Sequence, residues 1–193
     1  MAKSLRQQKM EEQLRNDIIK AALEIAESEG WEAVSTRKIA DKVEATTTPI
    51  YHYFGSKEGI LEKIQLEGFR KFREIVTSGA GSSADADEAL LNIAMNTFEF
   101  AAGSRQLYKL MFNLDGVYCG GKPKDEIKAT TKVLMDVLKK ITPSDVLDNF
   151  MNYWALTHGF ITIGLTQDLG TDLRSMESVY RNAVKRFTGS LRQ

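Results

Sequence analysis

The sequence predicts an all-α protein, with a three-helix helix-turn-helix head at the N-terminus and a larger helical-bundle body behind it. Apolar residues recur at helical spacing in most segments, and positions three or four apart form one face of an amphipathic helix. Only three prolines interrupt the chain, and the alternating pattern typical of strands is scarce. We expect the head to span residues 1–55 and the body residues 56–193.

The composition indicates a globular protein with no overall charge bias. The 193 residues, 42% of them hydrophobic, are enough for a sizeable core. The 26 basic and 26 acidic residues cancel, so any contact with nucleic acid must depend on a local arrangement of charge. Cys119 is the only cysteine, which excludes a disulfide within the chain and favours a reducing cytoplasm. The polar N-terminus and the short apolar runs predict neither a secretory signal nor a membrane-spanning helix.

Three helices are expected in the head. The first spans about residues 9–29 and ends at Gly30, because its apolar residues form one stripe. The second is capped by Ser35 or Thr36 and runs through Lys42. The third starts near Thr46. The apolar positions of the first stripe are Leu14, Ile18, Ala21, Ala22, Ile25 and Ala26.

The lengths of these helices, roughly 20, 8 and 8 residues, are typical of a helix-turn-helix, whose second helix lies in the DNA major groove while the first braces the backbone. Arg37 and Lys38 open the bracing helix, and Lys57 follows the recognition helix. The exposed face of that helix offers neutral hydrogen-bonding groups from Thr46, Thr47, Thr48, Tyr51 and His52, and the N-terminal tail adds Lys3, Arg6 and Lys9.

In the body, Ser56 is expected to cap a helix that ends near Val76, before a small and polar loop over residues 77–87. Thr142-Pro143 is a helix start signal, because a capping hydroxyl precedes a proline at the first helical position. Gly170 is a stop signal. Further helices are expected at about residues 86–102, 104–112, 124–141, 143–167 and 172–190, with a loop over 113–124.

The stretch from Ile18 to Leu61 resembles the N-terminal domain of the TetR (tetracycline repressor) family of bacterial regulators. The most specific part is IYHYFGSKEGIL, in which two aromatic residues are followed by Ser56-Lys57-Glu58 and then by an apolar pair. Other matching residues are Ile18, Ala21, Ala22, Gly30, Thr36, Ile39 and Ala40.

The resemblance implies residue roles on DNA. Phosphate contacts are implied for Thr36, Thr47, Tyr51, His52 and Lys57, and proximity to base edges for Thr46, Thr48 and Pro49. Arg37 is a further candidate contact. The chain departs from the family at Glu44, where glycine is usual, and a left-handed residue with a Cβ costs about 1 kcal/mol. Either the turn is altered or Glu44 faces solvent in an ordinary conformation.

The body resembles the family less closely. Trp154, His158 and Gly159 are similar to the Trp-His-Gly signature of one C-terminal subgroup. The resemblance implies a homodimer joined through the helices near 143–167 and 172–190, and a pocket for a small apolar or amphipathic effector among the middle helices. Candidate pocket residues are the aromatic and adaptable side chains Met95, Phe98, Tyr108, Met111, Phe112, Trp154 and His158, with Phe100 and Tyr118 beside them.

The leading hypothesis is a sequence-specific transcriptional regulator, a ligand-released repressor that binds double-stranded palindromic operator DNA as a dimer. The alternative is a helical ligand-binding or interaction protein whose head no longer binds DNA, because the first 60 residues carry nine basic and ten acidic side chains. Two histidines, one cysteine and no cluster of carboxylates argue against an enzyme, a metal site or a cofactor. Gly120-Gly121-Lys122 is interpreted as a turn, since it lacks the spacing of a phosphate loop.

Overall fold

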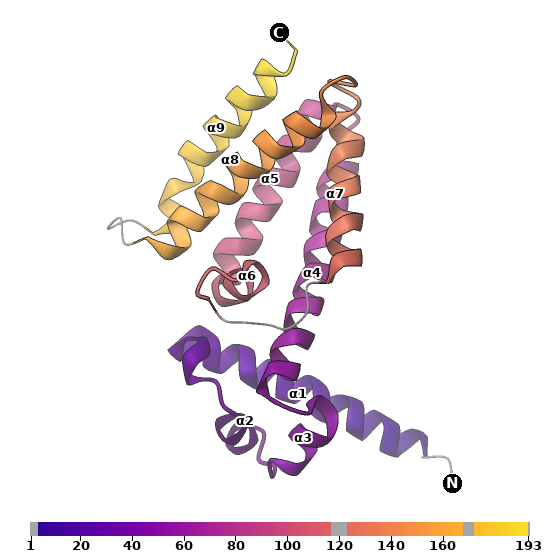
Figure 1. The fold of residues 1–193 in the computed structure, drawn as a ribbon, viewed down its shortest axis with the longest axis vertical. Coiled ribbons are helices and arrows are strands. Elements are labelled where there is room, and N and C mark those ends of the chain that lie inside the picture. The colour runs from indigo at the N-terminus through magenta and orange to yellow at the C-terminus, as the bar shows by residue number, and fades with distance from the viewer. Residues whose placement is uncertain (1–3, 117–122, 168–171, 193) are drawn as a thin grey trace.

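The computed structural model describes residues 4–116, 123–167 and 172–192. Over these residues the chain forms nine α-helices, two short 3-10 helices and no strand, which confirms the all-α prediction (Figure 1). No helix in these ranges is long and apolar enough to span a bilayer. The α-helices are α1 (Leu5–Glu29), α2 (Thr36–Lys42), α3 (Thr48–Phe54), α4 (Lys57–Gly81), α5 (Ala86–Gly103), α6 (Arg105–Phe112), α7 (Lys124–Leu138), α8 (Val146–Thr166) and α9 (Glu177–Ser190), and the 3-10 helices are η1 (Trp31–Ala33) and η2 (Leu173–Met176).

The head consists of α1, α2 and α3 packed around a small apolar core. Ile18, Ile39 and Ile50, one from each helix, have no exposed surface. Helix α1 begins four residues before the expected position, because Ser4 and Gln7 form a capping box that satisfies free N–H groups of the first turn. It ends at Gly30, as predicted, with φ +84°.

The turn between α2 and α3 adopts a left-handed conformation at Glu44. Its φ is +52°, so this glutamate occupies the conformation that favours glycine. The side chain is exposed to solvent. The expected alternative of an ordinary conformation at Glu44 is therefore wrong, because this residue adopts the left-handed conformation at a cost in local backbone strain.

Helix α4 joins the head to the body. Ser56 caps it, as predicted, by accepting a hydrogen bond from the Gly59 N–H at 3.3 Å. Its beginning contacts α1 and α3, and its later turns contact α5, α6 and α7. Figure 1 shows α4 rising out of the head into the bundle. The division of the chain at residues 55 and 56 stays a prediction, since this continuous helix contacts both parts.

The predicted end of α4 near Val76 is wrong, because the helix continues to Gly81. The residues beyond Val76 are small and polar, which favours a loop when they are considered alone. Gly79 is buried against α5, and a Cβ on it would lie 2.8 Å from the Ile93 backbone. Close packing of two helices therefore overrides the local preference.

The corner between α7 and α8 also differs from expectation. Helix α7 ends at Leu138 and α8 begins at Val146 with Asp145 as its N-cap, so Thr142-Pro143 does not start the helix. Thr142 instead stabilises the corner by accepting a hydrogen bond from Asn149 Nδ2 at 3.0 Å. Proline disfavours a helical residue before it, which is consistent with a turn here.

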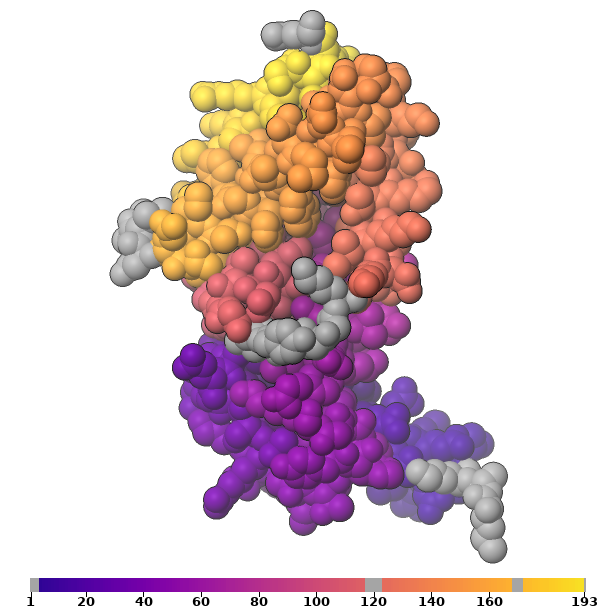
Figure 2. Space-filling model, viewed as in Figure 1, coloured from indigo at the N-terminus to yellow at the C-terminus, as the bar shows by residue number. Residues whose placement is uncertain are grey.

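Helices α8 and α9 cover α5 and complete the bundle. Two buried tyrosines join these helices to α5 by hydrogen bonds. Tyr153 Oη of α8 donates to the Leu90 carbonyl at 2.7 Å, and Tyr180 Oη of α9 donates to the Ala94 carbonyl at 3.0 Å. Figure 2 shows α7 and α8 side by side on one face of the body, with the head as a second lobe. The last helix begins at Glu177, after η2, and not at residue 172.

Several expectations concern residues outside the described part of the chain. These are the tail residue Lys3, the pocket candidate Tyr118, the single cysteine Cys119, the turn at Gly120-Gly121-Lys122 and the stop at Gly170.

We predict that Gly79→Ala lowers the free energy of unfolding by about 1–3 kcal/mol, because the added methyl group forces α4 and α5 apart. Urea unfolding followed by circular dichroism measures this change. Gly81→Ala is the matched control, since a Cβ there meets nothing within 4 Å. An equal loss in both variants would show that the α4–α5 contact is not the cause.

Candidate nucleic-acid interface and ligand cavity

The start of α3 and the start of α2 form a polar face on the head. Thr46, Thr48 and His52 are exposed, and the Tyr51 side chain is 53% exposed. Tyr51 Oη lies 3.3 Å from Thr36 Oγ1, which links the two helices through their polar ends. Thr36, Thr47 and Pro49 are half-buried at the base of this face. The face presents mainly hydroxyl groups, which can donate to a phosphate or accept from a base edge.

The positive charges next to this face differ in their availability. Lys38 pairs with Glu29 at 2.7 Å and Lys42 pairs with Glu24 at 3.0 Å, so two acidic residues of α1 neutralise part of α2. Arg37 is exposed and forms no ion pair within the described residues. Arg37 is therefore the more available charge at the start of α2.

Lys57 lies at the start of α4, where it has a structural role as well. Its Nζ donates to the Trp31 carbonyl at 3.2 Å. An ammonium group has three donors, so this contact leaves capacity for a phosphate oxygen. The hydrogen bond holds the charged group in a defined place at the edge of the polar face.

The joint between head and body depends on the first turn of α6. Trp31 Nε1 donates to the Gln106 carbonyl at 2.9 Å, and the Gln106 N–H donates to Glu27 Oε1 at 3.1 Å. Trp31 itself is 2% exposed, so this contact is shielded from water. The N-terminal end of α6 is therefore fixed to the head by two hydrogen bonds.

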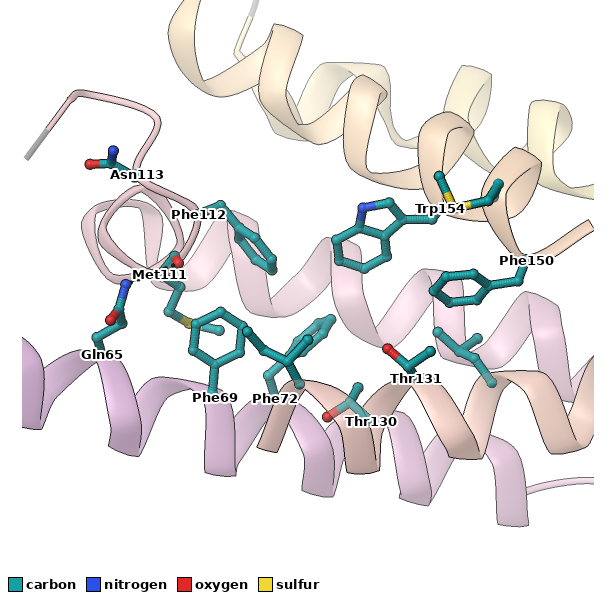
Figure 3. A pocket seen from close by; sticks show the side chains of 13 residues that line it. Gln65, Phe69, Phe72, Met111, Phe112, Asn113, Thr130, Thr131, Phe150 and Trp154 are labelled. Atoms are coloured by element: carbon teal, nitrogen blue, oxygen red, sulfur yellow. Dashed lines mark hydrogen bonds between the residues drawn. The ribbon is translucent and has the colours of Figure 1, made fainter. Parts of the chain in front are cut away.

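The body contains a cavity of about 630 Å³ between α4, α6, α7 and α8 (Figure 3). This volume lies within the usual range for sites that bind small molecules. None of the described side chains that line it is charged. The lining residues are Gln65, Phe69 and Phe72 of α4, Met111, Phe112 and Asn113 at the end of α6, Ile127, Thr130, Thr131 and Leu134 of α7, and Phe150, Met151 and Trp154 of α8.

An aromatic cluster forms one side of this cavity. The ring of Phe112 lies 5.6 Å from that of Trp154 and 6.0 Å from that of Phe72, measured between centroids. Trp154 stacks on His158 at 4.9 Å with an interplanar angle of 10°. Behind them, Tyr108 Oη lies 2.8 Å from His158 Nδ1. Burial lowers the pKa of His158, which favours the neutral imidazole, and raises the pKa of Tyr108 well above its ordinary value.

Small and apolar residues follow one another along α8 at intervals of four residues, a spacing that moves about 40° around the helix at each step. This row consists of Leu147, Met151, Ala155, Gly159 and Ile163. Three large side chains in the row, Leu147, Met151 and Ile163, are 61%, 54% and 41% exposed. Val179 on the neighbouring α9 is 57% exposed. Exposed apolar side chains on two neighbouring helices are typical of an interaction surface.

Comparison with known families agrees with this architecture. Residues 18–64 match the family model described as bacterial regulatory proteins, tetR family. Residues 90–187 match the model for tetracyclin repressor-like C-terminal domains. The chain belongs to the TetR family. The more specific assignment to a Trp-His-Gly subgroup stays a prediction.

Individual relatives of this TetR-family chain are distant. The HTH-type transcriptional repressor KstR2 of Rhodococcus jostii is 31% identical over 100 residues, which cover 49% of this chain and 48% of that protein. The chain thus spans about half the length of the curated relatives it matches. A Rhodococcus protein of unknown function shares the fold with a TM-score of 0.79 at 18% identity, over 93% of this chain and 96% of that one. FadR from Bacillus subtilis, solved in complex with stearoyl-CoA, does so with a TM-score of 0.71 at 22% identity, over 87% and 96%.

The structure brings together only part of the predicted pocket. Met111, Phe112 and Trp154 line the cavity, while Tyr108 and His158 lie directly behind that wall. Met95 and Phe98 are instead buried side chains of the α5 core and do not line the cavity.

Packing against α9 explains the place of Phe98, whose ring lies 4.9 Å from that of Tyr180. The sequence reasoning missed the α4 and α7 walls, including Phe69, Phe72 and Leu134. Their helical spacing is the same as that of core residues, so periodicity alone could not separate them.

We predict that acid destabilises the body through His158. The folded pKa lies below the ordinary value of 6.5, so the unfolded chain binds the proton more readily. The contribution of His158 to the free energy of unfolding is therefore fully present above pH 6.5 and is lost as the pH falls from there towards the folded pKa.

Urea unfolding of the wild type and of His158→Gln at two pH values, one on each side of the ordinary histidine pKa, measures the effect. Glutamine keeps a group that can accept a hydrogen bond from Tyr108, so the variant should lose less stability on acidification than the wild type. The same loss in both proteins would assign the pH dependence to other groups.

Proposed function

We propose that this chain is a ligand-released transcriptional repressor of the cytoplasm, which binds a palindromic operator in double-stranded DNA as a homodimer. The observation that carries the proposal is the exposed polar face of α2 and α3 on a TetR-type head. KstR2, which matches half of this chain, is named as a transcriptional repressor. The family is one of regulators, and no catalytic role is proposed for any residue.

In this proposal the polar face enters the major groove. Contacts to phosphates are assigned to Thr36, Thr47, Tyr51, His52 and Lys57, and the defined place of the Lys57 ammonium supports its assignment. Thr46, Thr48 and Pro49, at the start of α3, are assigned to base edges, because the N-terminal residues of a recognition helix reach them. Arg37 supplies a further phosphate contact.

The apolar row on α8 supports dimerisation. A second copy placed against the row would bury Leu147, Ile163 and, from α9, Val179. Ala155 and Gly159 in the middle of the row would let two helices approach closely. The helices near 143–167 and 172–190, which correspond to α8 and α9, are thus proposed as a four-helix interface.

The cavity supports a small apolar or amphipathic effector. The related fold of FadR was solved with stearoyl-CoA, which has a long hydrocarbon chain, and the cavity walls here are similarly suited to hydrocarbon. The wall of the cavity nearest the head includes Met111 and Phe112 of α6 (Figure 1). The other end of this helix accepts a hydrogen bond from Trp31. A ligand that moves α6 would therefore shift the head and change the separation of the two recognition helices.

A second candidate is a helical ligand-binding or interaction protein whose head no longer binds DNA. The pairing of Lys38 and Lys42 with acidic residues favours it, because those lysines are less available to phosphates. The exposed carboxylate of Glu44 adds a negative charge to the turn before α3. Binding to DNA distinguishes the two candidates.

We predict that selection from a random duplex library enriches a palindrome with the wild type and not with Tyr51→Ala. On the enriched operator, Arg37→Ala should weaken binding on all sequences. It should also reduce the slope of log K against log salt concentration by about one for each phosphate that the arginine neutralises in the wild type.

Lys132→Ala is the matched control for charge, since this exposed lysine lies on α7 in the body. Fluorescence anisotropy over a range of salt concentrations measures both quantities. No enrichment at low salt would overturn the repressor proposal in favour of the second candidate.

We predict that Gly159→Leu converts the dimer into a monomer. A Cβ on Gly159 meets nothing within 4 Å among the described residues of its own chain, so the larger side chain should leave the fold of one subunit intact. It would stand between the two copies of α8. Sedimentation equilibrium measures the mass, and Gly103→Leu, equally unhindered at the end of α5, is the control. A Gly159→Leu dimer would place the interface elsewhere.

A further inference from the structure

A positively charged side chain of α1 lies beside α3. The guanidinium carbon of Arg15 is over the ring of Tyr53, 4.6 Å from its centroid. The Tyr53 ring in turn lies 5.1 Å from the ring of His52, with an interplanar angle of 62°. His52 is exposed on the polar face of the head. A continuous row of contacts therefore runs from this polar face to the charge of Arg15.

The charge of Arg15 is available to an anionic partner. The residue is exposed and forms no ion pair in the described part of the chain, although Glu11 and Glu12 precede it by about one turn. In contrast, Lys38 and Lys42 of α2 are both paired with acidic residues. A guanidinium that lies over an aromatic ring keeps its N–H groups, which are in its own plane, for other partners. The ring thus holds the charge in place without using the groups that bind a phosphate.

The two tyrosines of α3 lie on opposite sides of the exposed His52. Tyr51 and Tyr53 are two residues apart, which corresponds to about 200° around a helix. Tyr51 faces α2 through its contact with Thr36, and Tyr53 faces α1 through its contact with Arg15. Figure 1 shows α2 on one side of α3 and the first turns of α1 on the other. The polar face of α3 is therefore bordered by a different helix on each side.

A helix in the major groove has a sugar–phosphate backbone on each side. The groove is about 12 Å wide and a helix with its side chains is about 10–12 Å across, so both borders of the helix come close to phosphates. In the proposed complex, Arg37 at the start of α2 contacts a phosphate on the Tyr51 border. On the Tyr53 border, Arg15 is the corresponding exposed charge.

We propose that Arg15 binds a backbone phosphate of the operator on the side of α3 opposite to Arg37, and that the Tyr53 ring positions its guanidinium there. This inference rests on the proposed binding to DNA and adds a contact from α1. Arginine binds phosphate through charged hydrogen bonds, which fix the position of the head and carry no sequence information. With one arginine on each border of the groove, the head is anchored to both strands of the duplex.

The salt dependence of binding to the palindrome enriched by the library selection tests the proposal. Arg15→Gln should weaken binding about tenfold at low salt, because one charged hydrogen-bonded contact is lost. It should also reduce the slope of log K against log salt concentration by about one, since one phosphate is no longer neutralised. Fluorescence anisotropy measures both quantities. A purely structural role of Arg15 would leave the slope unchanged.

Two further variants separate the contact from a general effect of charge. Lys20→Gln makes the same change in charge on an exposed residue of α1, about 140° around the helix from Arg15, and should keep the wild-type slope. Arg15→Lys keeps the positive charge, so its slope should also remain that of the wild type. The combination of Arg15→Gln with Arg37→Ala should lower the slope by about two, because the two arginines neutralise different phosphates.

The positioning role of Tyr53 is tested by a double-mutant cycle. Tyr53→Leu removes the aromatic ring and keeps an apolar side chain at this half-buried position. Arg15→Gln should then weaken binding by a smaller factor than it does in the wild type, since the guanidinium has already lost its support. Circular dichroism shows whether Tyr53→Leu is folded, and the slopes of the Arg15 variants decide the matter if it is not.

A wild-type slope in Arg15→Gln, an equal fall in Lys20→Gln, or a slope in Arg15→Lys as low as in Arg15→Gln would overturn the phosphate contact. Equal factors for Arg15→Gln with and without the ring of Tyr53 would overturn the positioning role. The selection distinguishes these results from a failure of the proposed function. An enriched palindrome with an unchanged slope overturns the Arg15 contact alone, whereas the absence of any palindrome overturns the repressor and this contact with it.

Discussion

The attachment of α6 at both ends is the constraint on which the rest of the structure depends. At its start, the Gln106 carbonyl accepts from Trp31 of the head, and at its end the Leu110 and Met111 carbonyls accept from Gln65 of α4. Helix α6 has only eight residues, too few to be stable without such contacts. It therefore connects the cavity to the head, and in the proposed mechanism a displacement at the cavity end would be carried to the head.

The cavity and the core share the same aromatic side chains, which explains how a pocket can exist in a well-packed body. Phe72 is 2% exposed, yet it lines the cavity and contacts Phe112 and Trp154. The buried Tyr108–His158 hydrogen bond supports this wall from behind. Because these rings are held on the core side, the proposed ligand would meet a preformed surface, and Met111 and Met151 are the lining side chains best able to adapt to it.

Most of the head could be predicted because its signals are local. Ser35 and Ser56 cap their helices and Gly30 ends α1, as expected. Of the expected exposed residues at α3, only Thr47 is half-buried. The body was predicted less completely because its deciding contacts are between distant segments. Gly79 continues α4 only because Ile93 packs on it, and Phe98 is core only because Tyr180 covers it. Helical periodicity identifies an apolar face and does not identify what that face contacts.

The head carries slightly more acidic than basic residues, which is compatible with DNA binding if the head is half of the proposed dimer. Glu24 and Glu29 pair with Lys42 and Lys38, so they stabilise the packing of α1 on α2 at the expense of basic charge. One such head offers few free cations and should bind DNA weakly by itself. Two heads joined through one dimeric body combine their affinities only when their spacing matches the operator. A weakly charged head therefore makes DNA binding more sensitive to spacing, which is the quantity that movement of α6 would change.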